Sequence, residues 1–388
     1  MKTKIFRIIE MYKSQLESAK KNPELAKKYL NTKIQVKKAR LLSKINYTPK
    51  ITGIVSAKLE VTQNCNSKCV TCNFWKINTL MNEEPIDQEK LSFEEFKKVI
   101  DQLNELKCQS LQLIGGETLL YKRITELIEY ATKKGMKSNI VTNGLLMTEE
   151  TAEKIVNSGL HSIVFSIDAK DPELNNKIRG VSKAFELQTK AIQLINKYDK
   201  NNKIHKSINC TVSVHNAHVL NEIIDIAHEL NIKEVSYIFL STYSKEIKNL
   251  TDKMFGKPTG SLEFMTSPSL IPKDIKKLKE QKELILKKAK KYNINIKGQF
   301  LTGKIYDLVN AVKRDKNLFC MLPFKFILVD VYGYAYPCDM LRYKLGNIRE
   351  KSLKKMFLSN EFKEFSKIYI NNYKYIEICK YCPLYCPV

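Results

Sequence analysis

The sequence contains no apolar run long enough to cross a bilayer, and its N-terminus shows no apolar segment followed by a small-residue cleavage site. These absences argue against a membrane or secreted protein, so we expect a soluble, cytoplasmic one. Arginine is also scarce, since only seven of the 66 basic residues are arginine. Because base-reading surfaces favour the forked guanidinium, the net charge of +25 does not by itself indicate nucleic-acid binding.

Cysteine is nearly missing from the middle of the chain. Three of the ten cysteines lie within 65–72 and five within 320–386, whereas the long stretch between them holds only Cys108 and Cys210. Disulfide-stabilised secreted proteins are usually short and evenly rich in cysteine. The distribution therefore predicts two metal sites in a reducing compartment. We interpret the two isolated cysteines as small buried apolar residues.

Residues 51–241 show a regular alternation of apolar runs and helical patterns. Helices are expected near 92–106, 120–134, 148–158, 183–198 and 218–230. Strands are expected near 54–61, 110–114, 138–142, 162–167, 207–214 and 234–240. Six strands alternating with helices predict an α/β domain with a parallel sheet, either open or curled into a partial barrel.

Three further segments flank this core. Residues 1–50 read as a basic helical extension with fourteen Lys or Arg against three Glu, either solvated or contacting an acidic partner. Residues 242–317 lose the alternation and read as a connector with a charged helix near 273–292. Residues 318–388 form a small C-terminal module.

The first cysteine group lies directly after the first expected strand. Cys65, Cys69 and Cys72 have the spacing C-x3-C-x2-C. Three close thiolates without a fourth indicate a cubane iron–sulfur cluster with one iron left open, whereas a closed zinc site needs a fourth ligand. The carboxyl end of a strand is also where barrel enzymes build their active sites.

This motif resembles the signature of the radical S-adenosylmethionine (radical SAM) superfamily. The resemblance implies a partial (β/α)6 TIM barrel whose [4Fe–4S] cluster binds S-adenosylmethionine through its open iron. It also implies that the cofactor is reductively cleaved to a 5′-deoxyadenosyl radical, which takes a hydrogen atom from an organic substrate. Many members have an aromatic residue before the third cysteine, where this chain has Thr71. Phe74 follows, and we expect it to pack on the adenine.

Further motifs stand at the later strand ends. Gly115, Gly116 and Glu117 resemble the GGE motif of the family, whose backbone holds the methionine amino group. The resemblance assigns the remaining cofactor-binding residues as Asn143 after the third strand, Ser166 and Asp168 on the ribose hydroxyls, and Arg179 as a carboxylate clamp.

The C-terminal cysteines resemble the twitch and SPASM modules of radical SAM enzymes, which carry auxiliary [4Fe–4S] clusters. Five thiolates cannot fully ligate two cubanes, so one auxiliary cluster is favoured, and a zinc site is the alternative. Its predicted ligands are Cys320, Cys338, Cys379 and Cys382, with Cys386 as a spare or substitute.

The resemblance also points to a base and to a class of substrate. Asp339 follows Cys338, and in related dehydrogenating enzymes an acidic residue here takes the substrate proton; the alternative is a surface hairpin aspartate. The implied substrate is a peptide or protein side chain, or a sugar or cyclitol. In one form of this hypothesis the reaction is a net oxidation of the substrate, and the auxiliary cluster accepts the electron. A flavodoxin or ferredoxin would donate electrons. The competing hypothesis is a non-enzymatic iron–sulfur electron carrier or redox-sensing nucleic-acid binder.

Overall fold

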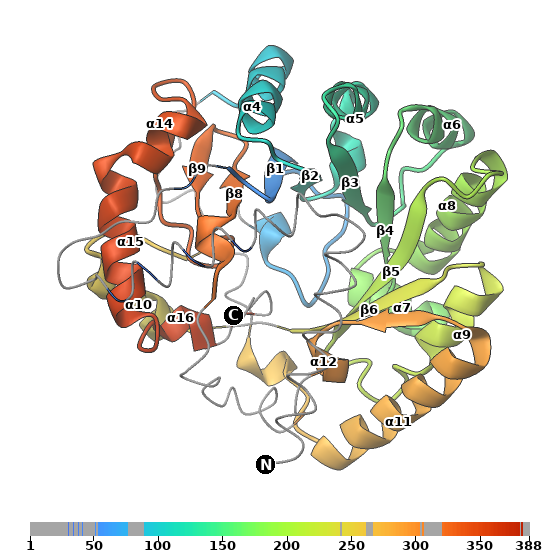
Figure 1. Ribbon diagram of the computed structural model, residues 1–388. Helices are drawn as coiled ribbons and strands as arrows, with labels where there is room; N and C mark the ends of the chain where they lie inside the picture. Colours follow the sequence, from blue (N-terminus) through green and yellow to red (C-terminus); the bar gives the residue numbers. More distant parts are fainter. Residues whose placement is uncertain are drawn as a thin grey trace.

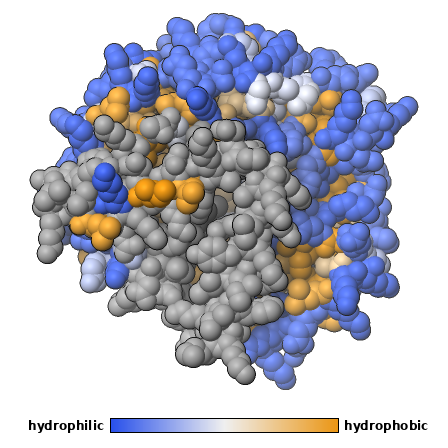
Figure 2. Space-filling model, in the orientation of Figure 1, coloured by the Kyte–Doolittle hydropathy of each residue, from blue (hydrophilic) through white to orange (hydrophobic). Residues whose placement is uncertain are grey.

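The computed structural model describes residues 51, 53–76, 89–240, 243–260, 267–302, 305, 320–380 and 382, together with four residues of the N-terminal segment. Those four, Leu30, Ile34, Lys38 and Leu41, are helical and exposed. The rest of the predicted basic extension lies outside the described residues. In the described part, no helix has the length and apolarity that a membrane span requires. Hydrophilic side chains dominate the described surface in Figure 2.

One curved sheet organises the described chain (Figure 1). Its order is β10-β9-β8-β1-β2-β3-β4-β5-β6-β7, and β8 and β1 to β7 are paired in parallel. The strands are β1 (Ser56–Thr62), β2 (Ser110–Gly115), β3 (Lys137–Thr142), β4 (Ser162–Ser166), β5 (His205–Val212), β6 (Glu234–Phe239), β7 (Asn295–Lys297), β8 (Phe326–Val329), β9 (Tyr334–Tyr336) and β10 (Gly346–Asn347).

Helices lie along the outer side of this sheet, with α4, α5, α6, α8, α9 and α11 following one another around the arc in Figure 1. The helices of the described residues are α4 (Phe93–Glu105), α5 (Ile124–Lys133), α6 (Glu149–Asn157), α7 (Pro172–Arg179), α8 (Ala184–Tyr198), α9 (Glu222–Glu229), α10 (Lys245–Phe255), α11 (Ile275–Tyr292), α12 (Gln299–Thr302), α14 (Leu353–Leu358), α15 (Asn360–Asn372) and α16 (Glu377–Lys380).

Local sequence signals fix where several of these helices begin. Ser92 and Glu95 form a capping box at the start of α4, in which each side chain accepts a hydrogen bond from the other residue's backbone N–H. Asp171 caps α7, Pro172 occupies its first turn, and Gly180 ends it at a φ of 64°. These signals determine where α7 stops, and therefore where its last side chain, Arg179, points.

The first strand, β1, has an apolar face and a charged face. Ala57, Leu59 and Val61 are almost fully buried and belong to the main hydrophobic core. Lys58 and Glu60 lie on the opposite face, because side chains alternate along a strand. Both make ion pairs with the segment that follows β9. The first strand therefore carries its charged residues toward the C-terminal module.

The fold confirms the predicted parallel α/β architecture and adds two features. The C-terminal module is continuous with the core sheet, because β8 pairs in parallel with β1, Ala57 lying opposite Ile327. Short β7 falls within the expected connector, yet it pairs with β6 and lengthens the sheet. The domain boundaries at residues 241 and 317 remain predictions. The charged helix expected near 273–292 is α11.

Candidate active site

The loop after β1 carries the first three cysteines on the inner side of the curved sheet (Figure 1). Cys65, Cys69 and Cys72 are half-buried, and none of the three is in a disulfide. Backbone N–H groups donate to two of them, from Ser67 to Cys65 Sγ at 3.5 Å and from Phe74 to Cys72 Sγ at 3.3 Å. Such donors stabilise negative charge on sulfur, as thiolate ligands of a cluster require.

Burial, with smaller contributions from the neighbouring Cys69 and Glu117, raises the pKa of the Cys65 thiol to about 11. A thiol in this position does not ionise near neutral pH unless a cation stabilises the thiolate. No three His, Cys, Asp or Glu side chains of the described chain converge closely enough to hold a single metal ion.

The cysteine loop is fixed by contacts from several elements. Its backbone N–H at Val70 donates to the carbonyl of Ile178 in α7 at 3.0 Å. The Trp75 indole Nε1 donates to the Cys69 carbonyl at 3.2 Å. An added Cβ at Gly180 would lie 2.4 Å from the carbonyl oxygen of Lys68, so only glycine fits there. The end of α7 and the cysteine loop are therefore packed backbone to backbone.

Gly115 and Gly116 allow the end of β2 to run directly against the same loop. A Cβ at Gly115 would lie 2.2 Å from the Thr62 carbonyl oxygen, and one at Gly116 would lie 2.3 Å from that of Asn64. The Gly116 and Glu117 N–H groups donate to these two carbonyls at 3.1 and 2.8 Å. The two glycines therefore shape the cysteine loop itself.

Glu117 links the ends of two neighbouring strands through hydrogen bonds. Its carboxylate accepts hydrogen bonds from Thr142 Oγ1 at 2.6 Å, from the Asn143 N–H at 2.7 Å and from the Leu119 N–H at 3.0 Å. The side chain is buried, and this burial raises its pKa although the three donors oppose the shift. Its contacts connect β2 to β3.

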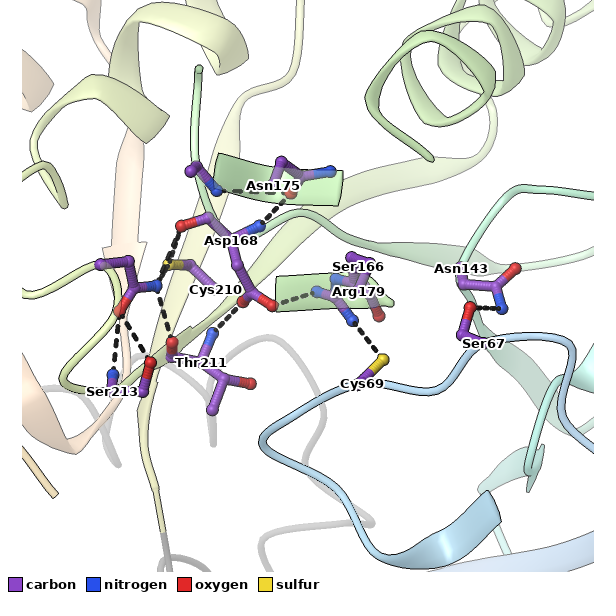
Figure 3. A network of polar contacts seen from close by, with 12 residues as sticks. Ser67, Cys69, Asn143, Ser166, Asp168, Asn175, Arg179, Cys210, Thr211 and Ser213 are labelled. Carbon is purple, nitrogen blue, oxygen red and sulfur yellow. Dashed lines mark hydrogen bonds and ion pairs between the residues drawn. The ribbon is translucent and has the colours of Figure 1, made fainter. Parts of the chain in front are cut away.

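Asn143 acts on the cysteine loop from the end of β3. Its Nδ2 donates to Ser67 Oγ at 2.9 Å (Figure 3). The same Nδ2 donates to Asn66 Oδ1 at 2.8 Å. Phe74 is buried in the short 3-10 helix Phe74–Lys76 that follows the loop. Ser166, which ends β4, is half-buried, and its carbonyl accepts from Gln188 Nε2 at 2.8 Å. Any contact of these residues with S-adenosylmethionine remains a prediction.

Asp168 and Arg179 face each other in a buried ion pair (Figure 3). Arg179 Nη2 lies 2.9 Å from Asp168 Oδ2, while Nη1 lies 4.0 Å from Cys69 Sγ. Asp168 Oδ1 accepts from the Thr211 N–H at 2.7 Å. Burial raises the pKa of Asp168, and Arg179 and Thr211 oppose that shift. The sequence placed both residues on the cofactor, but it did not predict that they pair with each other.

The C-terminal cysteines gather around one buried tyrosine. Tyr369 on α15 donates its hydroxyl to the Cys320 carbonyl at 3.1 Å. Its pKa is raised well above the usual value by burial and then by Cys320, Cys379 and Cys338. Burial also raises the pKa of Cys338 to about 12. Three thiols from distant segments therefore lie near Tyr369. Cys382 is also buried, and Cys386 lies outside the described residues.

Asp339 is held between two cations. Lys58 Nζ donates to its Oδ2 at 2.5 Å, and Arg342 Nη2 lies 3.7 Å from its Oδ1. Arg342 Nη2 also donates to Glu60 Oε1 at 2.5 Å. Burial alone would raise the pKa of Asp339, but Lys58 and Arg342 outweigh burial and lower it. A lowered pKa makes this carboxylate a weaker base. It is not the exposed hairpin aspartate that the alternative reading described.

Two family models match the parts of the chain that hold these sites. Residues 59–227 match the radical SAM superfamily, across the cysteine loop and the ends of β2 to β5. The chain belongs to the radical SAM superfamily. Residues 320–383 match the iron–sulfur cluster-binding domain SPASM, which includes Cys320, Cys338, Cys379 and Cys382.

Curated relatives agree with this assignment. The AdoMet-dependent heme synthase of Methanosarcina barkeri is 26% identical over 78% of this chain and 81% of its own length. The subtilosin biosynthesis protein AlbA of Bacillus subtilis is 23% identical over 78% of this chain and 59% of its own. Several other relatives are matched over about half of their length. The chain is thus a radical SAM enzyme and not a non-enzymatic iron–sulfur carrier.

A solved structure shares the fold. SuiB of Streptococcus suis bound to S-adenosylmethionine superposes with a TM-score of 0.61 at 17% identity, covering 89% of this chain and 75% of SuiB. SuiB has also been solved with its precursor peptide SuiA. At this identity the likeness establishes the fold alone.

The family implies a [4Fe–4S] cluster that binds S-adenosylmethionine and an auxiliary iron–sulfur site. The residues present fit both groups. Near the first site lie a guanidinium and three thiols, two of which accept hydrogen bonds from backbone N–H groups. Near the second, thiols from separated segments lie close to the buried Tyr369. Such donor sets suit iron–sulfur clusters.

Proposed function

We propose that this enzyme uses S-adenosylmethionine to abstract a hydrogen atom from a peptide or protein substrate. The observation that supports this most directly is the three-cysteine loop at the carboxyl end of β1, packed against the glycine-lined end of β2. When bound, the cluster and S-adenosylmethionine supply a carbon-centred radical that can take hydrogen from an unactivated position.

The chain's own residues have defined tasks in this proposal. Cys65, Cys69 and Cys72 hold the first cluster. The backbone of Gly115 and Gly116 lies close enough to the loop to approach the methionine amino group. The other proposed cofactor contacts are Phe74, Glu117, Asn143, Ser166, Asp168 and Arg179.

A second set of residues would serve the substrate. Cys320, Cys338, Cys379 and Cys382 hold an auxiliary cluster, with Cys386 as a spare or substitute. Asp339 takes a proton from the substrate if the reaction is a net oxidation. Lys58 and Arg342 keep that carboxylate ionised, at the cost of basicity.

Two relatives support a peptide substrate, because AlbA is a bacteriocin biosynthesis protein and another relative is the PqqA peptide cyclase of Bradyrhizobium diazoefficiens. A porphyrin is the second candidate, favoured by the heme synthase that aligns over 81% of its length. We also propose a small acidic electron donor such as flavodoxin or ferredoxin, and a cytoplasmic location. None of the nine cysteines of the described residues forms a disulfide, in keeping with a reducing compartment.

The substrate class can be tested by anaerobic incubation with short peptides encoded beside this gene, followed by mass spectrometry. We expect an S-adenosylmethionine-dependent mass change in one peptide, and transfer of deuterium from the labelled peptide into 5′-deoxyadenosine. The Cys65→Ala/Cys69→Ala/Cys72→Ala variant is the matched control. Haem production from porphyrin precursors, with every peptide unchanged, would overturn the peptide proposal in favour of the porphyrin.

A further inference from the structure

A buried cation stands directly behind one cysteine of the first site. Arg179 is 8% exposed and Asp168 is 1% exposed, so the pair is largely shielded from water. One guanidinium nitrogen faces Asp168 and another faces the sulfur of Cys69 (Figure 3). Within the described chain, the third nitrogen, Nε, has no hydrogen-bond partner.

The pair is held in place from both ends. The two neighbours of Arg179 contact the cysteine loop: the Ile178 carbonyl accepts from the Val70 N–H, and Gly180 packs on the Lys68 carbonyl. The backbone on both sides of Arg179 is therefore packed against the loop that carries Cys69.

Asp168 is equally fixed. Its backbone N–H donates to Asn175 Oδ1 at 3.0 Å, and its carbonyl accepts from Asn216 Nδ2 at 2.9 Å. The Thr211 N–H donates to Oδ1 of Asp168, and the other carboxylate oxygen, Oδ2, points toward Arg179. The charge beside Cys69 is thus preorganised before any cofactor arrives.

We infer that the Arg179–Asp168 pair sets the reduction potential of the cluster bound by Cys69, an inference that rests on the proposed function. Reduction adds one electron to the cluster, and a nearby positive charge stabilises the reduced form. Charges buried near a site act more strongly than exposed ones, because water screens them less. Arg179 therefore raises the potential, and Asp168, which lies behind it, lowers it.

This role differs from the carboxylate clamp expected from the sequence. A clamp acts on S-adenosylmethionine, so its loss changes cofactor affinity and leaves the potential of the cofactor-free cluster unaltered. The electrostatic role acts on the cluster alone, so its loss shifts the potential when no cofactor is present. The two roles are therefore separated by measuring each quantity on the same variants.

The experiment is an anaerobic redox titration of the reconstituted full chain, followed by electron paramagnetic resonance without S-adenosylmethionine. The first cluster is identified afterwards as the signal that changes when S-adenosylmethionine is added. Arg179→Gln should shift its midpoint potential to more negative values, and Asp168→Asn should shift it to more positive values by a smaller amount. Arg179→Lys, which keeps the charge, should return the potential toward that of the parent.

The control is Arg349→Gln, which breaks an ion pair with Glu95 at the start of α4. It should leave the potential unchanged. Equal midpoint potentials of the first cluster in the parent, Arg179→Gln and Asp168→Asn would overturn the inference. If the affinity for S-adenosylmethionine fell at the same time, the pair would instead act on the cofactor, as a carboxylate clamp does. If Asp168→Asn fails to fold, the comparison of Arg179→Gln with Arg179→Lys decides alone. A parent protein that binds no iron at the first site would contradict the proposed function instead.

Discussion

Replacing Gly116 by alanine should damage the first cluster site through the backbone alone. The added Cβ would lie 2.3 Å from the Asn64 carbonyl oxygen, 2.6 Å from its carbon and 2.9 Å from Cys65 Cβ. Ordinary contact begins near 3.4 Å, so the backbone must move by roughly 1 Å. Two of the three close atoms are main-chain atoms, which cannot turn away as a flexible side chain would. We expect a loss of about 1–3 kcal/mol in the free energy of unfolding, typical of overpacking.

The assay has two parts, thermal unfolding of the iron-free protein and iron analysis after anaerobic reconstitution. Gly116→Ala should lower the melting temperature and retain only the iron of the auxiliary site. Gly135→Ala is the matched control, because its Cβ would meet no atom within 4 Å and the substitution costs only the strain of a φ of 77°. That control should lose some stability and no iron. Full iron and unchanged S-adenosylmethionine affinity in Gly116→Ala would refute the reasoning.

Four further predictions concern the other parts of the site. Cys338→Ala should lose about four irons, whereas Cys386→Ala should keep nearly all of its iron by metal analysis; equal loss would make both residues ligands. Glu117→Gln replaces a carboxylate that accepts three hydrogen bonds, so calorimetry should show a loss of about 1–3 kcal/mol in the free energy of unfolding. An unaltered melting temperature would contradict the role of Glu117 in linking β2 to β3. Asp339→Asn should still form 5′-deoxyadenosine while substrate oxidation falls about 10²–10⁴-fold, and product at the parent rate would make the carboxylate structural. Because Lys58 lowers the pKa of Asp339, Lys58→Met should move the acidic limb of the pH–rate profile to higher pH; an unshifted limb would exclude Asp339 as the base.

The fold was largely predictable because the core strands have a clear pattern in the sequence. Strands β1 to β6 are short apolar runs bounded by polar or glycine-containing turns, and α4 begins with a capping box that is visible in the sequence. The four-residue β8 and the three-residue β7 gave no comparable signal. Pairing of β8 with β1 depends on contacts across more than 260 residues, which local pattern cannot reveal.

The candidate site was predictable as a set of residues, but their mutual contacts were not. The motifs placed Glu117, Asn143 and Asp168 at or just after the ends of the second, third and fourth strands, as the structure has them, whereas α7, which ends at Arg179, was not expected. Their spacing could not show that Asp168 and Arg179 form an ion pair or that Asn143 holds the cysteine loop, since these contacts depend on side-chain directions.

The contacts of Asp339 also could not be predicted from the sequence. Its position beside Cys338 suggested a base, whereas the two cations that lower its pKa come from β1 and from the αL residue Arg342. The alternation of Lys58 and Glu60 with apolar residues on β1 was the available signal, because charges on a central strand need partners on the inner face.

The central claim is that Cys65, Cys69 and Cys72 hold a cluster that cleaves S-adenosylmethionine. The most direct measurement is the yield of 5′-deoxyadenosine and methionine from anaerobically reconstituted, chemically reduced protein, compared with the variant in which all three cysteines are alanine. We predict about eight irons per chain and formation of 5′-deoxyadenosine in the parent, against about half of the iron and no 5′-deoxyadenosine in the variant. Cleavage retained by the triple variant, or absent from a parent that carries its full iron, would contradict the account.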